Sequence, residues 1–507
     1  MESLSHFVQE LVDQIAPIEY QSNIDWWRQA TTGSEEATLQ MHESQLALAK
    51  LFSSREKYQK LLSFPETSDT SLLRQVKLLK DAFIEHQIPE DLLEEIVQLE
   101  VQIETDYTNF RPSLLGKEVS NNELKEVFFT SNSSLERKEA WEASKKIGEV
   151  VEKKILRLVE LRNRAASLVG YSDFYTMRLE LQEIDQKRLF EILDELEQLS
   201  DPIFHAYKAQ LDLQLAMRFG IEEKDLAPWH YQDPFFQEAP HTGINFNSYY
   251  KGKDIVAISR NYYATLNLSV DDILERSDLF ERENKSQHAF CMTMDRGSDV
   301  RILCNVRDDE YWMGTQLHEL GHAVYDKYID QSLPYLLRHY AHISTTEAIA
   351  MLFGRLSCDA HFLRTFCGAQ EALDGADQIR AKLLVFARWV LVMTHFERAL
   401  YQRPSIELST FWWECVEKYQ GIRCPQGRHK PDFASKLHLA CAPVYYQNYL
   451  LGEMTASQLL RHLGEKPGEY LKERLFSLGA KHPWEETLFL ATGERLNLAY
   501  FIEDLKN

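Results

Sequence analysis

The feature that most constrains the fold of this chain is its shortage of residues that form turns. Only 20 glycines and 15 prolines occur among the 507 residues, together about 7% of the chain against roughly 12% in an average protein. A sandwich or barrel of short strands needs many turns, so the sequence predicts a mainly α-helical fold. Hydrophobic residues make up 44% of the chain, which is ample for a packed core and excludes a disordered protein.

The charge balance limits the possible partners. The formal net charge is −22, whereas a nucleic acid or an anionic membrane is bound through a cationic surface, so we expect neither as a partner. The seven cysteines are odd in number and none is spaced CxxC, which predicts reduced thiols. The first residues lack both a basic start and a long apolar run. We therefore expect a cytoplasmic protein. We also expect it to be a monomer.

The periodicity of apolar residues predicts helices over most of the chain. It predicts several amphipathic helices up to about residue 110, and one long helix, broken once, between Ser133 and Gly170. Between Gln287 and Val306 the period changes. Two runs of strand-forming residues flank the turn Asp295-Arg296-Gly297-Ser298, which predicts a β-hairpin. Helical patterns then return and continue to the C-terminus.

The string TQLHELGHAVYDKYI contains the residues that point to chemistry. His318 and His322 are four residues apart, so both imidazoles project from one face of a helix and suit one tetrahedral metal ion. Glu319 lies next to them, which completes an HExxH motif. In such motifs the two histidines bind zinc and the glutamate is the general base for a metal-bound water. The apolar residues around the motif predict a buried helix, and the sequence thus predicts a Zn²⁺ site.

A catalytic zinc site needs a third protein ligand. Glu347, 25 residues after His322, lies in an apolar segment that predicts a buried helix, and it is the preferred candidate. The string Ser344-Thr345-Thr346-Glu347 also resembles a capping box, which would give this glutamate a structural role. Asp326 and Asp330 are rivals, although their positions one and two turns after His322 point them along the helix.

HELGH followed by a helical glutamate resembles the oligoendopeptidase F and thimet oligopeptidase family of zinc metallopeptidases, with features of the related angiotensin-converting enzyme family. The resemblance extends in collinear order from about Leu161 to Leu451. It is carried by the segments LRNRAASLVGYSDFYTMRLE (161–180), PWHY (228–231), SQHAFCM (286–292) and SKLHLACAPVYYQNYLLGEM (435–454).

The last of these segments resembles the one that supplies a second histidine and a tyrosine to the reaction. The resemblance implies that His438 and Tyr449 are catalytic and stabilise the oxyanion, with Tyr445 and Tyr446 as alternatives to Tyr449. It also implies that Lys436 binds the carboxylate of a substrate.

Other substrate-binding residues follow from the same resemblance. Tyr446 would assist Lys436, and Gln232 is a further candidate there. His288 and Ala289 would hold a peptide as an added strand. One position departs from the converting-enzyme pattern, because Met351 stands where an aspartate buttresses a zinc-binding histidine. Asp326 or another carboxylate would have to replace it.

The family resemblance implies a large two-lobed helical zincin with a deep central substrate groove and a small β-hairpin beside the HExxH helix. We expect a single metallopeptidase unit over 1–507, a helical lid region over 1–115 and a catalytic core over 280–460. The predicted activity is hydrolysis of short peptides, as an oligopeptidase or a peptidyl-dipeptidase. Two alternatives are a zinc metallocarboxypeptidase that removes single C-terminal residues and an inactive helical peptide-binding protein.

Overall fold

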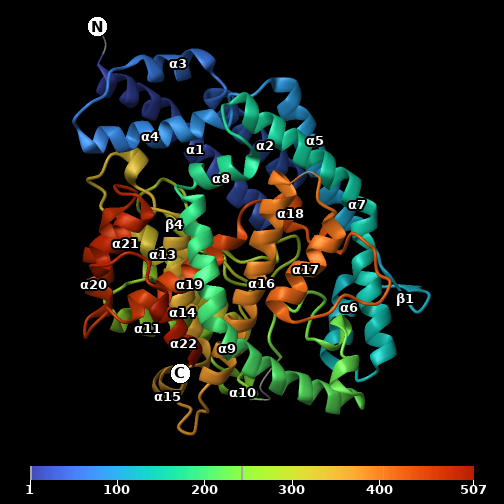
Figure 1. The fold of residues 1–507 in the computed structure, drawn as a ribbon. Helices are drawn as coiled ribbons and strands as arrows, with labels where there is room; N and C mark the ends of the chain where they lie inside the picture. Colours follow the sequence, from blue (N-terminus) through green and yellow to red (C-terminus); the bar gives the residue numbers. More distant parts are fainter. Residues whose placement is uncertain (1–2, 241–243, 404, 507) are drawn as a thin grey trace. The chain divides into compact units, whose positions relative to one another are not determined.

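Helices dominate the computed structural model, which describes residues 3–240, 244–403 and 405–506. Within these residues the chain forms 22 α-helices, six short 3₁₀ helices and two two-stranded sheets, β1–β2 and β3–β4 (Figure 1). The prediction of a mainly α-helical fold is confirmed. The elements are α1 (Leu4–Thr32), α2 (Glu35–Phe52), α3 (Arg55–Ser63), α4 (Thr70–Ile84), α5 (Glu90–Asn109), β1 (Ser113–Leu114), β2 (Lys117–Glu118), α6 (Asn121–Thr130), α7 (Ser134–Leu168), α8 (Phe174–Leu181), α9 (Gln186–Phe219), α10 (Asn247–Tyr250), α11 (Ile255–Thr265), α12 (Asp271–Arg276), β3 (Phe290–Thr293), β4 (Val300–Leu303), α13 (Glu310–Lys327), α14 (Ile343–Gly354), α15 (Ala360–Phe366), α16 (Ala376–Gln402), α17 (Leu408–Gln420), α18 (His438–Cys441), α19 (Tyr446–Leu460), α20 (Pro467–Arg474), α21 (Trp484–Thr492) and α22 (Leu498–Lys506).

The chain divides into two compact units, and each is built from three separate segments. The first unit comprises Met1–Gln87, Gly243–Ala376 and Leu451–Phe501. The second comprises Ile88–Thr242, Asp377–Leu450 and Ile502–Asn507. The HExxH helix α13 and the hairpin β3–β4 therefore belong to the first unit, whereas His438 and the tyrosines 445, 446 and 449 belong to the second.

The long helix predicted after Ser133 is present, but the prediction that it is broken once was wrong. Helix α7 runs without interruption for 35 residues, and the Ser133 side chain accepts the backbone N–H of Glu136 at its start. Gly148 lies in the middle without ending the helix. It permits a close contact, since a Cβ atom there would come within 2.5 Å of the carbonyl oxygen of Pro431.

The predicted hairpin is confirmed in the first unit. Strands β3 and β4 pair antiparallel, with Phe290 opposite Leu303 and Thr293 opposite Val300. On one face, Phe290, Met292 and Met294 pack with Trp27 of α1 and other apolar side chains. Helix α13 also packs against both strands. The hairpin thus connects the N-terminal helix to the element that bears the HExxH motif.

Helices α13 and α14 pack closely side by side (Figure 1). Asp309 caps α13 by accepting the backbone N–H of Trp312 at 2.8 Å, which fixes where this helix begins. Gly321, inside the HExxH motif, lies at the contact between the two helices. A Cβ atom at this position would come within 2.8 Å of the Cα atom of Ala350. The absence of a side chain at Gly321 therefore sets how closely the helices approach.

No helix within the described ranges combines the length and the apolar character needed to cross a lipid bilayer. All seven cysteines are free thiols, and four of them are buried.

Candidate functional site

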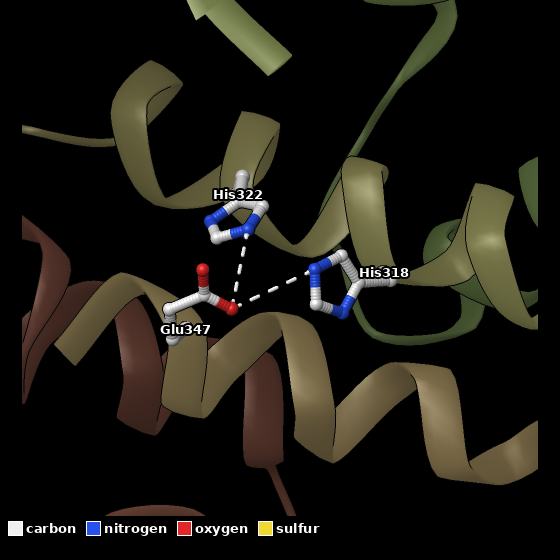
Figure 2. A group of neighbouring side chains, drawn as sticks. All are labelled: His318, His322 and Glu347. Atoms are coloured by element: carbon white, nitrogen blue, oxygen red, sulfur yellow. Dashed lines mark ion pairs between the residues drawn. The ribbon is translucent and has the colours of Figure 1, made fainter. Parts of the chain in front are cut away.

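Three of the sequence-predicted residues converge in the first unit. His318 and His322 project from one face of α13, and Glu347 projects toward them from α14 (Figure 2). Oε2 of Glu347 lies 3.7 Å from Nε2 of His318 and 3.9 Å from Nε2 of His322. One ligand atom from each residue lies within 4.8 Å of the other two. The three ligand atoms are close enough together to bind one shared ion.

The charge states of these groups fit a divalent cation. Burial lowers the pKa of His318 to about 4, and burial followed by the proximity of His318 lowers the pKa of His322 well below its usual value. Both imidazoles are therefore neutral near pH 7, so each can carry its proton on Nδ1 and offer the lone pair of Nε2 to a cation. With both protons on Nδ1, two nitrogen lone pairs and a carboxylate oxygen would converge on one point, which suits a bound cation.

The donor set also fits zinc in particular. Two imidazole nitrogens and one carboxylate oxygen are typical of catalytic zinc sites, which retain one open position. Tetrahedral coordination at about 2.1 Å separates ligand atoms by about 3.4 Å, slightly less than the distances from Glu347 to the two histidines. His318, His322 and Glu347 are thus the residues that would hold the ion.

The start of α14 differs from the sequence interpretation. The helix begins at Ile343, and the ring of His342 caps it by accepting the backbone N–H of Ser344 at 3.0 Å. The predicted capping box of Ser344 with Glu347 was therefore wrong, because the helix starts earlier and Glu347 already lies in its second turn. Its side chain is directed at the histidines instead. Gly452 packs against it closely, since a Cβ atom added at Gly452 would lie 3.1 Å from the Cβ atom of Glu347.

The two rival carboxylates lie apart from this group. Asp326 is buried at the end of α13, where burial raises its pKa to about 7. Asp330 follows the helix and accepts the backbone N–H of Ser332 at 2.8 Å. Neither belongs to the cluster of possible metal ligands, because side chains one and two turns beyond His322 point away along the helix axis.

Glu319 is buried beside the two histidines on α13. Burial, followed by the charge of Glu347, raises its pKa to about 8. Burial and the charge of Glu453 likewise raise the pKa of Glu347 to about 7. The two carboxyl groups share a region that disfavours negative charge, and a bound cation would relieve this cost.

Thr346 is a site residue that the sequence analysis missed. Its hydroxyl oxygen lies 2.7 Å from Nδ1 of His322, and the side chain is 1% exposed. Sequence reasoning looked instead for a carboxylate to replace the aspartate absent at Met351. At His322 the hydrogen-bonding partner is a hydroxyl group, and its position just before Glu347 is the only signal that could have identified it.

The predicted residues Lys436, His438 and Tyr446 lie together in the second unit. The Lys436 ammonium is buried, donates to Oε1 of Gln237 at 2.7 Å and lies 5.6 Å from the centre of the Tyr446 ring. The rings of His438 and Tyr446 are 4.9 Å apart. Gln237, rather than the expected Gln232, contacts the lysine. The proline-rich loop that carries both glutamines has no periodicity from which this could be predicted.

The candidate tyrosines of α19 and the loop before it form one aromatic cluster within the same unit. Tyr449 lies 5.0 Å from Tyr445 and 5.9 Å from Tyr446, measured between ring centres. Tyr446 is buried, whereas Tyr445 and Tyr449 are half-buried. Burial, followed by the charge of Lys436, lowers the pKa of His438 to about 4, so this imidazole is also neutral near pH 7.

His288 and Ala289 immediately precede β3 in the first unit. His288 is exposed and Ala289 is half-buried. The backbone N–H of His288 donates to the hydroxyl of Ser286 at 3.3 Å. The strand itself begins at Phe290, so His288 and Ala289 lie just before it, and their side chains lie outside the cluster of possible metal ligands.

Comparison with known proteins identifies a family and several relatives. A model of the peptidase M2 family, described as angiotensin-converting enzyme, matches residues 1–230 and 242–496. The chain is 27% identical to an angiotensin-converting enzyme of Haematobia irritans exigua over 258 residues, which are 44% of this chain and 41% of that protein. It is 25% identical to carboxypeptidase 1 of Bacillus subtilis over 278 residues, 45% of this chain and 53% of that protein.

A longer match is found to the angiotensin-converting enzyme-like protein Ace3 of Mus musculus. The identity is 23% over 430 residues, which are 73% of this chain and 57% of the mouse protein. The matches thus span about half the length of these relatives.

The matched family is the second of the two that the sequence resembles. Its model covers both units of the chain and includes His318, His322 and Glu347. The chain belongs to the angiotensin-converting enzyme family of metallopeptidases, peptidase family M2.

Proposed function

We propose that this protein is a zinc-dependent peptidase that hydrolyses short peptides. The observation that supports the proposal most strongly is the convergence of His318, His322 and Glu347 next to a buried Glu319. This arrangement supplies three ligands and a general base, which are the groups that zinc-assisted hydrolysis requires. Membership of a metallopeptidase family supports the same function.

Glu319 would act as the general base. The chemistry that zinc supplies when bound is Lewis acidity toward water and toward the scissile carbonyl. Glu319 would take a proton from the attacking water and return it to the leaving amine. Burial raises the pKa of Glu319, which favours the protonated carboxyl group that such a proton shuttle passes through.

The roles of the second-unit residues are part of this proposal, and the family resemblance supports them. His438 and Tyr449 would donate hydrogen bonds to the oxyanion. Lys436, assisted by Tyr446, would bind a substrate carboxylate. Lys436 suits this role because its hydrogen-bonding partner, Gln237, is neutral. The charges of Asp233 and Glu238 also act on Lys436 and favour its ammonium form.

The edge of β3 is the proposed place for the peptide backbone. Among the described residues β3 pairs only with β4, so its other edge has no neighbouring strand. A substrate that adds a strand there would hydrogen-bond to the backbone near His288 and Ala289. The proposed lid region is 1–115 and the proposed catalytic core is 280–460. We further propose a monomer that acts in the cytoplasm.

The number of residues removed per cleavage distinguishes the candidate functions. We favour an oligopeptidase or peptidyl-dipeptidase. The match to a bacterial carboxypeptidase supports removal of single C-terminal residues as a second candidate. An inactive binding protein is a third reading, since one relative is an inactive angiotensin-converting enzyme-related protein of Caenorhabditis elegans, 26% identical over 207 residues. The presence of Glu319 argues against this third reading.

Mass spectrometry of the products from a peptide mixture tests the proposal. The zinc-loaded protein should release dipeptides or internal fragments, and Glu319→Gln should abolish cleavage while zinc content stays at one ion per chain. Glu310→Gln, on the same helix, is the matched control and should remain active. Equal activity of the wild-type protein and Glu319→Gln would refute the proposed function. A ladder of single-residue losses would establish the carboxypeptidase alternative.

A further inference from the structure

Two stacked aromatic rings lie beside β3 in the first unit and have no role in the function proposed above. The rings of Trp26 on α1 and Phe290 on β3 are 4.9 Å apart and inclined by 19°. Trp26 is 38% exposed and Phe290 is half-buried. Exposed tryptophan is uncommon, because burial of its large apolar surface stabilises a fold. The stack leaves an aromatic surface next to the strand that would receive a peptide.

The hydrogen-bonding register of the hairpin shows which backbone groups of β3 point away from β4. The N–H of Met294 donates to the carbonyl of Asp299 at 2.8 Å, so the backbone groups of Met294 point toward β4. In an antiparallel pair this orientation alternates along the strand. The backbone groups of Phe290 and Met292 therefore also point toward β4, whereas the N–H and carbonyl groups of Cys291 point to the open edge.

The far edge of β4 confirms the alternation. Ile302 lies opposite Cys291, and its backbone groups are engaged on the side away from β3. Its N–H donates to the Ser277 hydroxyl at 2.8 Å, and its carbonyl accepts the N–H of Asp278 at 3.1 Å. Cys291, its partner in the register, must therefore point outward on the opposite edge.

The same register assigns the side chains of a bound peptide to faces of the sheet. Residues opposite each other on neighbouring strands project to the same face. A peptide residue opposite Phe290 would project toward α1, where Trp26 lies. The residues before and after it would project to the other face. Cys291 lies on that face, and burial, Asp326 and Glu319 raise the pKa of its thiol well above the usual value.

We propose that Trp26 and Phe290 form a subsite that selects an aromatic or large aliphatic side chain at one position of the substrate. The inference rests on the proposed peptidase function and names its substrate class. The polar groups nearby are already engaged. The Asn23 amide donates to the carbonyls of Thr293 and Met294, and Arg301 pairs with Asp299 at 2.7 Å. The subsite thus offers apolar surface without a charge to match an acidic or basic residue.

Cleavage kinetics on peptides that differ at one position at a time test this inference. Each position would carry Phe, Leu, Asp or Lys in turn, and kcat/KM would be measured for the wild-type protein. We expect Phe or Leu to be preferred over Asp by about 10-fold or more at one position. Trp26→Ala should reduce that preference about 10-fold and leave the other positions unchanged, whereas Trp26→Phe should retain it. Leu39→Ala, which shortens another exposed apolar side chain, is the matched control.

A binding measurement separates loss of the subsite from loss of the fold. In Glu319→Gln, a peptide with Phe at the selected position should change tryptophan fluorescence, and the change should shrink when Trp26→Phe is added. An unchanged preference in a folded Trp26→Ala variant would overturn the subsite while the peptidase function stands. If the zinc-loaded wild-type protein cleaved none of the peptides, the function and the subsite would fail together.

Discussion

The hydroxyl oxygen of Thr346 lies 2.7 Å from Nδ1 of His322, and the opposite ring nitrogen, Nε2, faces Glu347. A neutral imidazole carries one proton, so a lone pair on Nε2 for a metal requires the proton on Nδ1. The Thr346 hydroxyl accepts that proton in a hydrogen bond and holds the ring in the orientation that binds metal. In this way Thr346 acts on the ion through His322.

Replacement of Thr346 by valine should weaken zinc binding. The valine keeps the shape of the buried side chain but removes the acceptor for the His322 N–H, and losses of this kind cost about 10- to 100-fold in metal affinity. Thr346→Ser should retain the affinity. Competition with a chromogenic chelator measures it on the metal-free protein. Thr345→Val is the matched control, because that hydroxyl donates to the carbonyl of His342 and should affect stability alone. Equal affinities of Thr346→Val and wild type would refute the role.

Zinc should raise the thermal stability of the protein. An ion that binds only the folded state at 1,000 times its Kd stabilises that state by about 4 kcal/mol. We expect a chelator to lower the unfolding temperature in differential scanning fluorimetry and added zinc to restore it. His322→Ala and Glu347→Gln should lose most of this response. A full zinc response in both variants would show that the ion binds elsewhere.

Gly321→Ala should disturb both the packing of the helices and the metal group. The added methyl group would lie 2.8 Å from the Cα atom of Ala350, which is too close for any rotamer change to relieve, so α13 and α14 must separate. Overpacking of this kind costs about 1–3 kcal/mol. Urea unfolding measures the loss, and the zinc affinity should fall with it because Glu347 moves with α14. Unchanged stability would contradict the close contact.

Buried Lys145 should make the stability of the second unit depend on pH. Burial lowers its pKa to about 7, and its ammonium lies 3.2 Å from the centre of the Phe235 ring. In the unfolded chain the pKa of a lysine is about 10.4. Between these values the unfolded state binds more protons, so this group makes stability rise as pH rises from about 7 to about 10. Below pH 7 the lysine is charged in both states, and the full free-energy cost of burying its charge remains.

Comparison with Lys145→Met isolates the contribution of Lys145 to the pH dependence of stability. The variant should be more stable than the wild-type protein at pH 6, and the difference should shrink by at least about 1 kcal/mol by pH 9. Urea unfolding midpoints at several pH values give the difference, because titrating groups that do not interact with Lys145 cancel between the two proteins. A difference that stays constant with pH would refute the lowered pKa.

Leu115→Asn should stabilise the small hairpin β1–β2. Leu115 and Gly116 form its two-residue turn with φ of 50° and 80°, a conformation that favours Asn-Gly and disfavours leucine. Leu115 is 65% exposed, so its removal costs little packing. We expect a gain of about 1 kcal/mol in the free energy of unfolding. Leu135→Asn, at an exposed position of α7 with helical geometry, should give no gain.

Features encoded within one short segment were predictable from the sequence. His318 and His322 share a helix face because they are four residues apart, and the hairpin follows from the alternation around Gly297. Glu347 was identifiable because it is the one charged residue of α14 and an apolar run follows it. In each case the signal depends on neighbours along the chain.

Features that depend on packing between distant segments were not predictable. The contact of Thr346 with His322 requires the close approach of α13 and α14 at Gly321, and no local pattern shows this. Lys436 contacts Gln237 across 199 positions of sequence, and no local pattern identifies Gln237 as its partner. Gly148 stays within the continuous helix α7, where it packs against Pro431, and no local pattern shows this contact either.

The position of α1 on the hairpin bears on how the chain folds as it is synthesised. Asn23 bonds to Thr293, 270 positions later, and Ser286 N–H donates to the carbonyl of Ala30. Helix α1 therefore emerges from the ribosome long before the strands that it covers. The residues of α1 near its N-terminus, such as Leu11, pack against α2 to α4, which follow at once, but Trp27 and Ala30 at its other end pack on the hairpin and must wait for it. That exposed end slows folding and is open to aggregation while the chain is made. We expect packing of the first unit to be completed only after most of the chain has been made, and chaperones to bind this end of α1 until then.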